Sequence, residues 1–303
     1  MSENPKLGAI SDPTPIAHLL AGHPINVVFA GGGNRCLWQA GFWTEAAPRL
    51  GLVPRRIAAT SAGAAIASVV FAGRIRAGLA HFRAATAANA RNFYPANLLR
   101  GRPVFPHATM YRHALLTIID APALARLHAG PEIIVPVTRA PGWLGPRAAF
   151  AVAGIVDAFE RAVAPSPHPR FAGRLGFRAE YASVRDCATP EALADLVLAS
   201  SCTPPFTPLL RHAGSPALDG GIADNAPVDA AGEGPTLLLL TRPFKRLPVH
   251  PLRTYVQPSR PIPVSAWDYT DPDGLSAAFA LGQRDAAQWC AEISSRATTI
   301  ETK

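Results

Sequence analysis

A chain of 303 residues and 31.9 kDa is long enough to bury one large hydrophobic core or two small ones. Its content of 49% hydrophobic and only 17% charged residues excludes an intrinsically disordered protein, because disordered chains are poor in apolar and rich in charged side chains. The formal net charge of +8 favours an acidic partner, but no zinc finger, RNA-binding motif or basic heptad accompanies it, so we expect no nucleic acid.

The predicted elements alternate between short buried strands and helices. Apolar runs bounded by glycine and proline predict strands, and longer stretches rich in alanine and leucine predict helices. In chain order we expect a strand over 25–30, a helix over 34–48, a strand over 56–60, a helix from 62, a helix over 110–127, a strand over 132–138, a helix over 190–199 and a strand over 235–241. This alternation is typical of an α/β fold with a largely parallel central sheet.

The two ends of the chain have different patterns. Residues 1–24 are predicted to be an N-terminal extension with one short helix near Ile16–Leu20, and residues 25–303 to form one domain. Asp271-Pro272 predicts the start of a C-terminal helix over about 272–294, because an aspartate cap followed by proline favours a first turn. Its core-facing stripe is Leu275, Phe279, Gly282, Ala286, Trp289 and Ile293, with Gln283, Arg284, Asp285 and Glu292 off the stripe.

Cysteine and histidine are scattered along the sequence. The four cysteines form no CxxC pair and no Cys/His ligand spacing, so we expect reduced thiols, a cytoplasmic protein and no bound metal. We also expect no secretory signal and no membrane-spanning helix, because no apolar run approaches the roughly 20 residues that span a bilayer.

The first motif is a glycine-rich turn, Gly31-Gly32-Gly33-Asn34-Arg35, directly after the strand over 25–30. Its backbone N–H groups and the positive end of the following helix form a site for an anion, either a phosphate or the oxyanion of a tetrahedral intermediate. The dinucleotide pattern GxGxxG fails at Cys36, and no acidic residue follows at the ribose-binding distance. We therefore expect no nucleotide and no other cofactor.

The second and third motifs carry the candidate catalytic pair. Ser61 lies between a short strand and a helix of small residues, with Gly63 two positions later, which is the context of a nucleophile elbow. Asp219 is followed by Gly220 and Gly221. Either motif alone is more often a helix cap or a turn. A glycine turn, a serine elbow and Asp-Gly-Gly in one chain, in this order, favour acyl transfer.

Four segments together resemble the patatin-like phospholipase family. They are Gly31 to Arg35, Thr60 to Gly63, Leu198 to Phe206, and Leu218 to Pro227, and they cover roughly residues 25–230 in the order that the family has. The resemblance implies a three-layer α/β/α fold that acts on lipid esters with a Ser-Asp dyad and no catalytic histidine. It implies Ser61 as nucleophile, Asp219 as base, Gly31, Gly32, Gly33, Asn34 and Arg35 as the oxyanion loop, and Gly63, Gly220 and Gly221 as supporting glycines.

Two departures from the family pattern bear on activity. Cys36 stands where a glycine is usual, and it would cost roughly 1 kcal/mol if that position needed a positive φ. Ala59 replaces the usual first glycine of the elbow. These departures leave open a catalytically silent lipid-binding protein with this fold. A second alternative is an α/β-hydrolase whose triad would be Ser61, Asp219 and His250.

Basic residues gather around the predicted elbow. Between Glu45 and Asp120 there is no acidic residue, and this stretch contains ten arginines. Apolar groups such as Phe93 and Leu98-Leu99 lie beside Arg91, Arg100 and Arg102. The pattern predicts peripheral contact with an anionic membrane surface, with compositional bias as the alternative explanation. The sequence makes no prediction of the oligomeric state.

Overall fold

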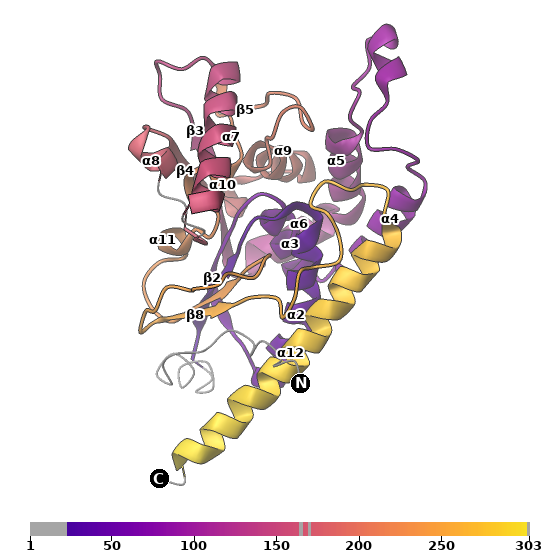
Figure 1. The fold of residues 1–303 in the computed structure, drawn as a ribbon. Helices are drawn as coiled ribbons and strands as arrows, with labels where there is room; N and C mark the ends of the chain where they lie inside the picture. Colours follow the sequence, from indigo (N-terminus) through magenta and orange to yellow (C-terminus); the bar gives the residue numbers. More distant parts are fainter. Residues whose placement is uncertain (1–22, 164–165, 169–170, 302–303) are drawn as a thin grey trace, which may run out of the picture.

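A six-stranded sheet forms the middle layer of the computed structural model, which describes residues 23–163, 166–168 and 171–301 (Figure 1). The strand order is β4-β3-β2-β1-β7-β8, and only β4 runs antiparallel to its neighbour. The strands are β1 (Ile25–Phe29), β2 (Pro54–Ala59), β3 (Glu132–Arg139), β4 (Arg178–Ser183), β7 (Thr236–Leu239) and β8 (Arg253–Val256). A separate ribbon pairs β5 (Arg211–His212) with β6 (Ser215–Pro216).

The central strands are apolar on both faces because helices cover both faces of the sheet. In β1 the side chains of Val27 and Phe29 enter one hydrophobic cluster, while Val28 and the following Ala30 enter another on the opposite face. All of these side chains are buried. This is the pattern expected of a parallel sheet inside an α/β protein.

Helices on the two sides of the sheet complete three layers (Figure 1). The larger cluster packs α2 (Leu37–Leu50), α3 (Ala62–Phe71), α4 (Ile75–Ala87), α5 (His107–Ile118), α6 (Ala121–Ala129), α9 (Pro190–Ser200) and α12 (Pro272–Glu301). The other side has α7 (Pro146–Val163), α8 (Phe171–Arg174), α10 (Gly220–Asp224) and α11 (Val228–Ala231). Short segments of 3-10 helix are η1 (Gly33–Cys36), η2 (Pro95–Arg100) and η3 (Val184–Asp186).

The long C-terminal helix α12 lies along α2 at backbone contact distance. A Cβ atom on Gly282 would lie 2.1 Å from the carbonyl oxygen of Trp38, and one on Gly41 would lie 2.0 Å from that of Phe279. The expectation that Asp285 lies off the buried stripe is wrong. Its side chain is buried and accepts hydrogen bonds from Trp38 Nε1 (2.7 Å) and Ser259 Oγ (2.7 Å), which replace its lost hydration.

Most predicted elements are present, with two kinds of difference. The helix expected over 110–127 is two helices, because the Asp120 side chain accepts the Ala123 N–H and caps α6. The sequence pattern did not indicate β4, β8, α4 or α7. Residues 1–22, including the short helix expected near Ile16–Leu20, lie outside the described residues. None of the helices in the described ranges is both long and apolar enough to cross a bilayer.

Parallel pairing places the motifs at one edge of the sheet. β1 ends just before Gly31, β2 ends just before Ser61 and β7 ends just before Thr241. From β1 the order continues to β2 and β3 on one side and to β7 and β8 on the other. The carboxyl ends of strands at such a switch point form the crevice where α/β proteins bind ligands.

Candidate functional site

Ser61 lies in a sharp turn between β2 and α3. Its backbone has φ +54° and ψ −129°, a conformation that residues other than glycine rarely adopt and that costs of order 1–3 kcal/mol. Gly63 makes the turn possible, because a Cβ there would lie 2.5 Å from the carbonyl oxygen of Phe29. The strain and the close approach hold the serine at the start of α3.

The structure brings Ser61 and Asp219 together across 158 residues of sequence. Ser61 Oγ donates a hydrogen bond to Asp219 Oδ2 at 2.8 Å. The other carboxylate oxygen, Oδ1, accepts the N–H of Gly221 at 2.7 Å. The Asp219 N–H donates to the carbonyl of Cys202 at 2.9 Å, and Gly220 begins α10 with its Cα buried. The backbone of its own turn therefore helps to orient the aspartate toward Ser61.

The glycine-rich loop after β1 is fixed by two backbone hydrogen bonds. The N–H of Gly31 donates to the carbonyl of Asn225, and that of Asn34 to the carbonyl of Ala266, both at 3.1 Å. Gly33 has φ +59°, and a Cβ there would lie 2.3 Å from the Ala266 carbonyl oxygen. Only glycine fits this position without strain.

In the described structure, the N–H groups of Gly32 and Gly33 are not used to hold the loop in place. Gly32 and Gly33 both line the cavity that contains Ser61, and none of the described backbone hydrogen bonds uses the N–H of either residue. Arg35 lines the same cavity, and its Nε donates to the Gly32 carbonyl at 3.2 Å. Amide donors beside a guanidinium are suited to stabilising a negative charge next to Ser61.

Cys36 does not strain the loop. Its φ is −64°, so the position requires no glycine and the cost considered from the sequence does not arise. The thiol is buried and donates weakly to the Ala30 carbonyl at 3.5 Å. Burial raises the pKa of Cys36 far above its ordinary value, so this thiol stays protonated and is no nucleophile.

Ser200 is a contact residue that the sequence did not single out. Its side chain is fully buried, and its Oγ accepts the N–H of Ser61 at 3.0 Å and donates to the Pro136 carbonyl at 2.6 Å. The hydroxyl thus links the Ser61 turn to β3. The serine lies within the Leu198–Phe206 stretch that carries the family resemblance, which was the available signal.

The cavity that contains Ser61 and Asp219 has a volume of about 200 Å³ and a largely polar wall. Its lining includes Arg242, Asn225, Thr203 and Trp267 in addition to the residues of the three motifs. No histidine is among the described residues that line it. His250 instead uses its Nδ1 to accept the N–H of Leu252 in an outer loop. Within the described ranges, no three His, Cys, Asp or Glu side chains are grouped as a metal site would need.

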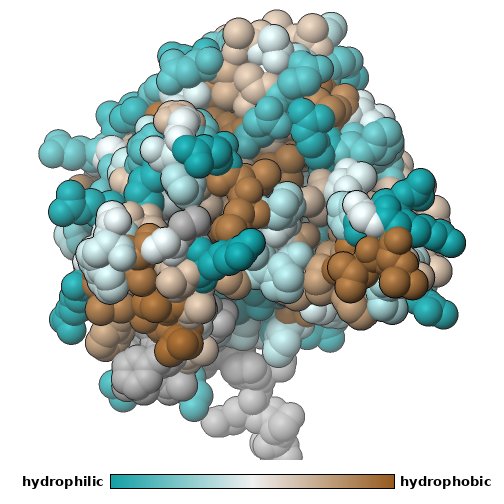
Figure 2. Space-filling view, turned by 90° about the horizontal axis from the view of Figure 1, so that it is seen from above, coloured by the Kyte–Doolittle hydropathy of each residue, from teal (hydrophilic) through white to brown (hydrophobic). Residues whose placement is uncertain are grey.

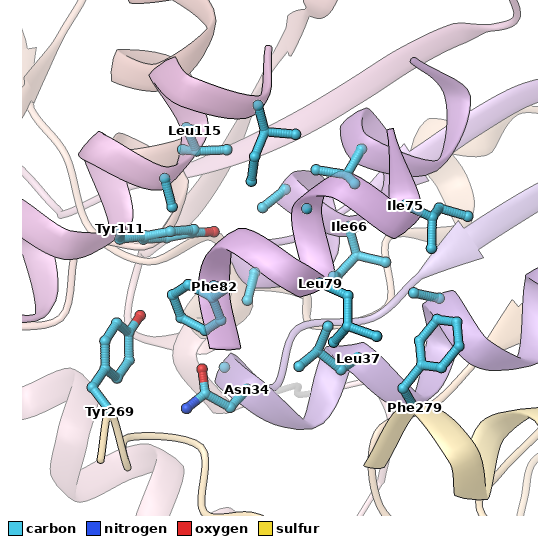
Figure 3. Close-up of a pocket in the computed structure, with 18 residues that line it drawn as sticks. Asn34, Leu37, Ile66, Ile75, Leu79, Phe82, Tyr111, Leu115, Tyr269 and Phe279 are labelled. Carbon is cyan, nitrogen blue, oxygen red and sulfur yellow. The ribbon is translucent and has the colours of Figure 1, made fainter. Parts of the chain in front are cut away.

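A second, apolar pocket of about 90 Å³ adjoins this cavity, and Gly33 lines both. Figure 3 shows Tyr111, Tyr269 and Asn34 at one end of the pocket and Ile75 and Phe279 at the other. Burial raises the pKa of both tyrosines, so their hydroxyls remain neutral. The polar end adjoins the glycine loop, and the rest of the pocket is suited to an apolar chain.

Comparison with known families agrees with this geometry. The model of the patatin-like phospholipases matches residues 27–231, which contain the end of β1, the glycine-rich loop, the serine turn and the Asp219 turn. A comparison with curated protein sequences gave no significant match. The family has a three-layer α/β/α fold and acts on lipid esters, and the expected fold class is confirmed. The chain belongs to the patatin-like phospholipase family of lipid acyl hydrolases.

Proposed function

We propose that the protein hydrolyses acyl esters of lipids with the dyad of Ser61 and Asp219. The observation that supports this most directly is the 2.8 Å hydrogen bond from Ser61 Oγ to the Asp219 carboxylate. A nucleophile must lie within hydrogen-bond reach of the base that takes its proton. The alternative triad has no comparable support, because His250 contacts neither residue in the described structure.

The first half of the reaction forms an acyl-enzyme. Ser61 Oγ attacks the ester carbonyl carbon while its proton passes to Asp219 Oδ2. The resulting oxyanion accepts hydrogen bonds from the N–H groups of Gly32 and Gly33, within the loop from Gly31 to Arg35, and is further stabilised by the Arg35 charge. Asp219 then returns the proton to the alcohol oxygen as the C–O bond breaks, and the alcohol leaves.

The second half repeats these steps with water. Asp219 accepts a proton from a water molecule, whose oxygen attacks the acyl carbonyl in the same oxyanion site. When the C–O bond to Ser61 breaks, the proton returns to Oγ and the fatty acid leaves. Asp219 is suited to this exchange because its Oδ1 is already held by the Gly221 N–H, so Oδ2 does not rotate away.

We place the acyl chain of the substrate in the apolar pocket between α3, α4 and α5. Its walls include Ile66, Leu79, Phe82 and Leu115, and it meets the catalytic cavity at Gly33. Burying methylene groups here gives binding energy of about 0.8 kcal/mol each.

All four cysteines of the chain are buried free thiols, which supports a reducing compartment such as the cytoplasm as the location.

The experiment that tests the proposal is covalent labelling with a fluorophosphonate. The adduct should be found on Ser61 by mass spectrometry and should be absent from Ser61→Ala. Hydrolysis of a soluble ester should fall by about 10⁴-fold or more in Ser61→Ala and in Asp219→Asn, because the two side chains act as one unit. Circular dichroism checks that both variants remain folded.

His250→Ala is the matched control and should stay within a few-fold of wild type. A loss of several orders of magnitude in His250→Ala would instead support a triad. Labelling of another serine, or full activity in Ser61→Ala, would contradict the dyad. A wild-type protein that takes no label and hydrolyses no ester would be the silent lipid-binding alternative.

A further inference from the structure

A loop of residues 91–106 projects from the body of the molecule between α4 and α5 (Figure 1). Its arms are joined where the N–H of Tyr94 donates to the Val104 carbonyl at 2.8 Å, and its tip is the short helix η2. At that tip Leu98 is 75% exposed and Leu99 is 91% exposed. Two adjacent leucines this exposed have no packing role in the folded chain.

Positive charge extends from the base of the loop to its tip. Arg91, Arg100 and Arg102 are all exposed, and none of them is in an ion pair with a described carboxylate. No acidic residue occurs in the sequence between Glu45 and Asp120. Figure 2 shows an apolar patch bordered by hydrophilic side chains on the side where the loop projects in Figure 1.

The base of the loop is fixed to the catalytic side of the molecule. The Asn92 side chain donates to Asp268 Oδ1 at 2.9 Å and accepts the Tyr269 N–H at 2.8 Å. Asn89 Nδ2 donates to the Tyr269 carbonyl at 2.9 Å. The carboxylate of Asp268 is therefore held at the base of the loop, where it does not pair with the arginines at the tip.

A row of aromatic rings runs from the loop to the catalytic cavity. Phe93, which is 50% exposed, lies 5.2 Å from Phe105 between ring centroids, and Phe105 lies 5.2 Å from Phe206. Phe206 stacks on Trp267 at 4.8 Å, and Trp267 lines the cavity that contains Ser61. An apolar surface is therefore continuous between the projecting loop and the candidate nucleophile.

We propose that the loop of residues 91–106 docks the protein on the surface of an anionic phospholipid bilayer. Leu98 and Leu99 enter the boundary between headgroups and acyl chains, while the three arginines contact lipid phosphates. Once the loop is docked, the aromatic row gives an acyl chain an apolar path to the cavity. The purpose of this docking rests on the proposed function, but the binding itself does not.

The combination of groups favours a bilayer over another polyanion. A nucleic acid would contact the arginines but would leave the two leucines in water. A bilayer accepts both groups at once, because its interface offers phosphates and hydrocarbon within a few ångströms of each other. Charge attraction at the surface also predicts that binding weakens with salt.

The test is co-sedimentation of the full chain with vesicles of phosphatidylcholine alone or mixed with phosphatidylglycerol, at low and physiological salt. Wild type and Ser61→Ala should both bind the anionic vesicles, more weakly at higher salt, and neither should bind the neutral ones well. Replacing Arg91, Arg100 and Arg102 together by Gln should weaken binding about a hundredfold. Leu98→Ser with Leu99→Ser should weaken it about tenfold or more.

Matched controls change similar residues elsewhere on the surface. Val249→Ser removes an apolar side chain that is 71% exposed, and Arg178, Arg246 and Arg260 changed together to Gln remove three exposed arginines. Both controls should bind as wild type, and all loop variants should hydrolyse a short soluble ester at the wild-type rate. The ester assay measures the activity proposed for Ser61 and Asp219. If the wild-type protein hydrolysed no ester, the proposed function would be contradicted, but the vesicle-binding result would still stand.

Three results would overturn the docking proposal. Equal binding to neutral and anionic vesicles, or binding indifferent to salt, would exclude the arginines as lipid contacts. Binding that needed the arginines but not the leucines would show that charge alone attracts the loop and that Leu98 and Leu99 do not enter the bilayer. Equal losses in the control variants would show that overall charge and hydrophobicity, not this loop, bring the protein to vesicles.

Discussion

At the scale of single residues, the backbone of Ser61 lies where only glycine is free of strain. With φ at +54°, any residue that has a Cβ atom is held there by the surrounding structure. The fold carries this cost at the position where the proposed chemistry needs a hydroxyl facing the cavity. Strain of this kind is measurable, because it disappears when the Cβ atom is removed.

We therefore predict that Ser61→Gly is more stable to unfolding than Ser61→Ala by about 1 kcal/mol, although both are inactive. The control is Ser68, a buried serine in the middle of α3. There Ser68→Gly should be less stable than Ser68→Ala by about 1 kcal/mol, as in an ordinary helix. Urea denaturation measures all four variants, and the same order at both sites would show that Ser61 is unstrained.

Ser200 should act on turnover through the position of Ser61. Ser200→Ala leaves the Ser61 N–H and the Pro136 carbonyl without their buried partner, so we expect a tenfold to hundredfold lower kcat, with roughly unchanged KM, and a loss of about 1–3 kcal/mol of stability. Ser68→Ala is again the control, because Ser68 Oγ donates only to Ala64 within α3. If both variants had equal kcat, Ser200 would be a packing residue.

The residue scale also shows what a sequence alone can and cannot predict about the site. Ser61 and Asp219 stand in local motifs, so their types and neighbours indicate their chemistry. The role of Ser200 is not indicated in this way, since the family resemblance covers its stretch but its two partners lie 139 and 64 residues away in the chain. The choice of donors within the glycine loop likewise depends on which N–H groups other segments already occupy.

At the scale of elements, α2 and α12 pack with their backbones in close contact. Gly282→Ala would place a methyl group 2.1 Å from the Trp38 carbonyl, so we expect a loss of about 1–3 kcal/mol or more as α12 moves away. Gly154 lies in α7 with open space around its Cα, and Gly154→Ala should be neutral or stabilising by up to about 1 kcal/mol. Chemical denaturation compares the two, and equal destabilisation would contradict the close approach.

Whether a strand could be predicted from the sequence depended on how deeply the sheet buries it. β1, β3 and β7 are mostly apolar because the sheet buries them on both sides, β2 is apolar and buried in its second half, and all four were predicted. The sequence of β4 is largely polar and half-exposed, because it is the antiparallel edge strand, and such a strand has no strong pattern. Tertiary pairing, not local preference, makes it a strand.

At the scale of the whole molecule, the apolar pocket should set the preferred acyl length. Ala114 lines the pocket from α5, so Ala114→Leu should narrow it and lower kcat/KM for a decanoyl ester about tenfold or more, with little effect on an acetyl or butyryl ester. Leu79→Ala should widen it and favour longer chains. The measurement is a series of nitrophenyl esters.

Ala123→Leu controls for overpacking, because Ala123 is buried in α6 and does not line the pocket. It should change stability but not the order of preference among the esters. If Ala114→Leu lowered activity equally on every ester, the acyl chain would bind elsewhere.

The sequence separation within the dyad has a consequence for the synthesis of the protein. Ser61 and Asp219 are 158 residues apart, and the hydrogen bond from Thr241 Oγ1 to the Gly31 carbonyl closes a separation of 210 residues. On a ribosome the serine emerges long before its base, and the strand that completes the crevice emerges later still. Chains that end before β7 contain the proposed nucleophile but lack the assembled site. A nascent chain therefore cannot carry out the proposed hydrolysis on the lipids around it, and only completed, folded molecules have the proposed dyad in its crevice.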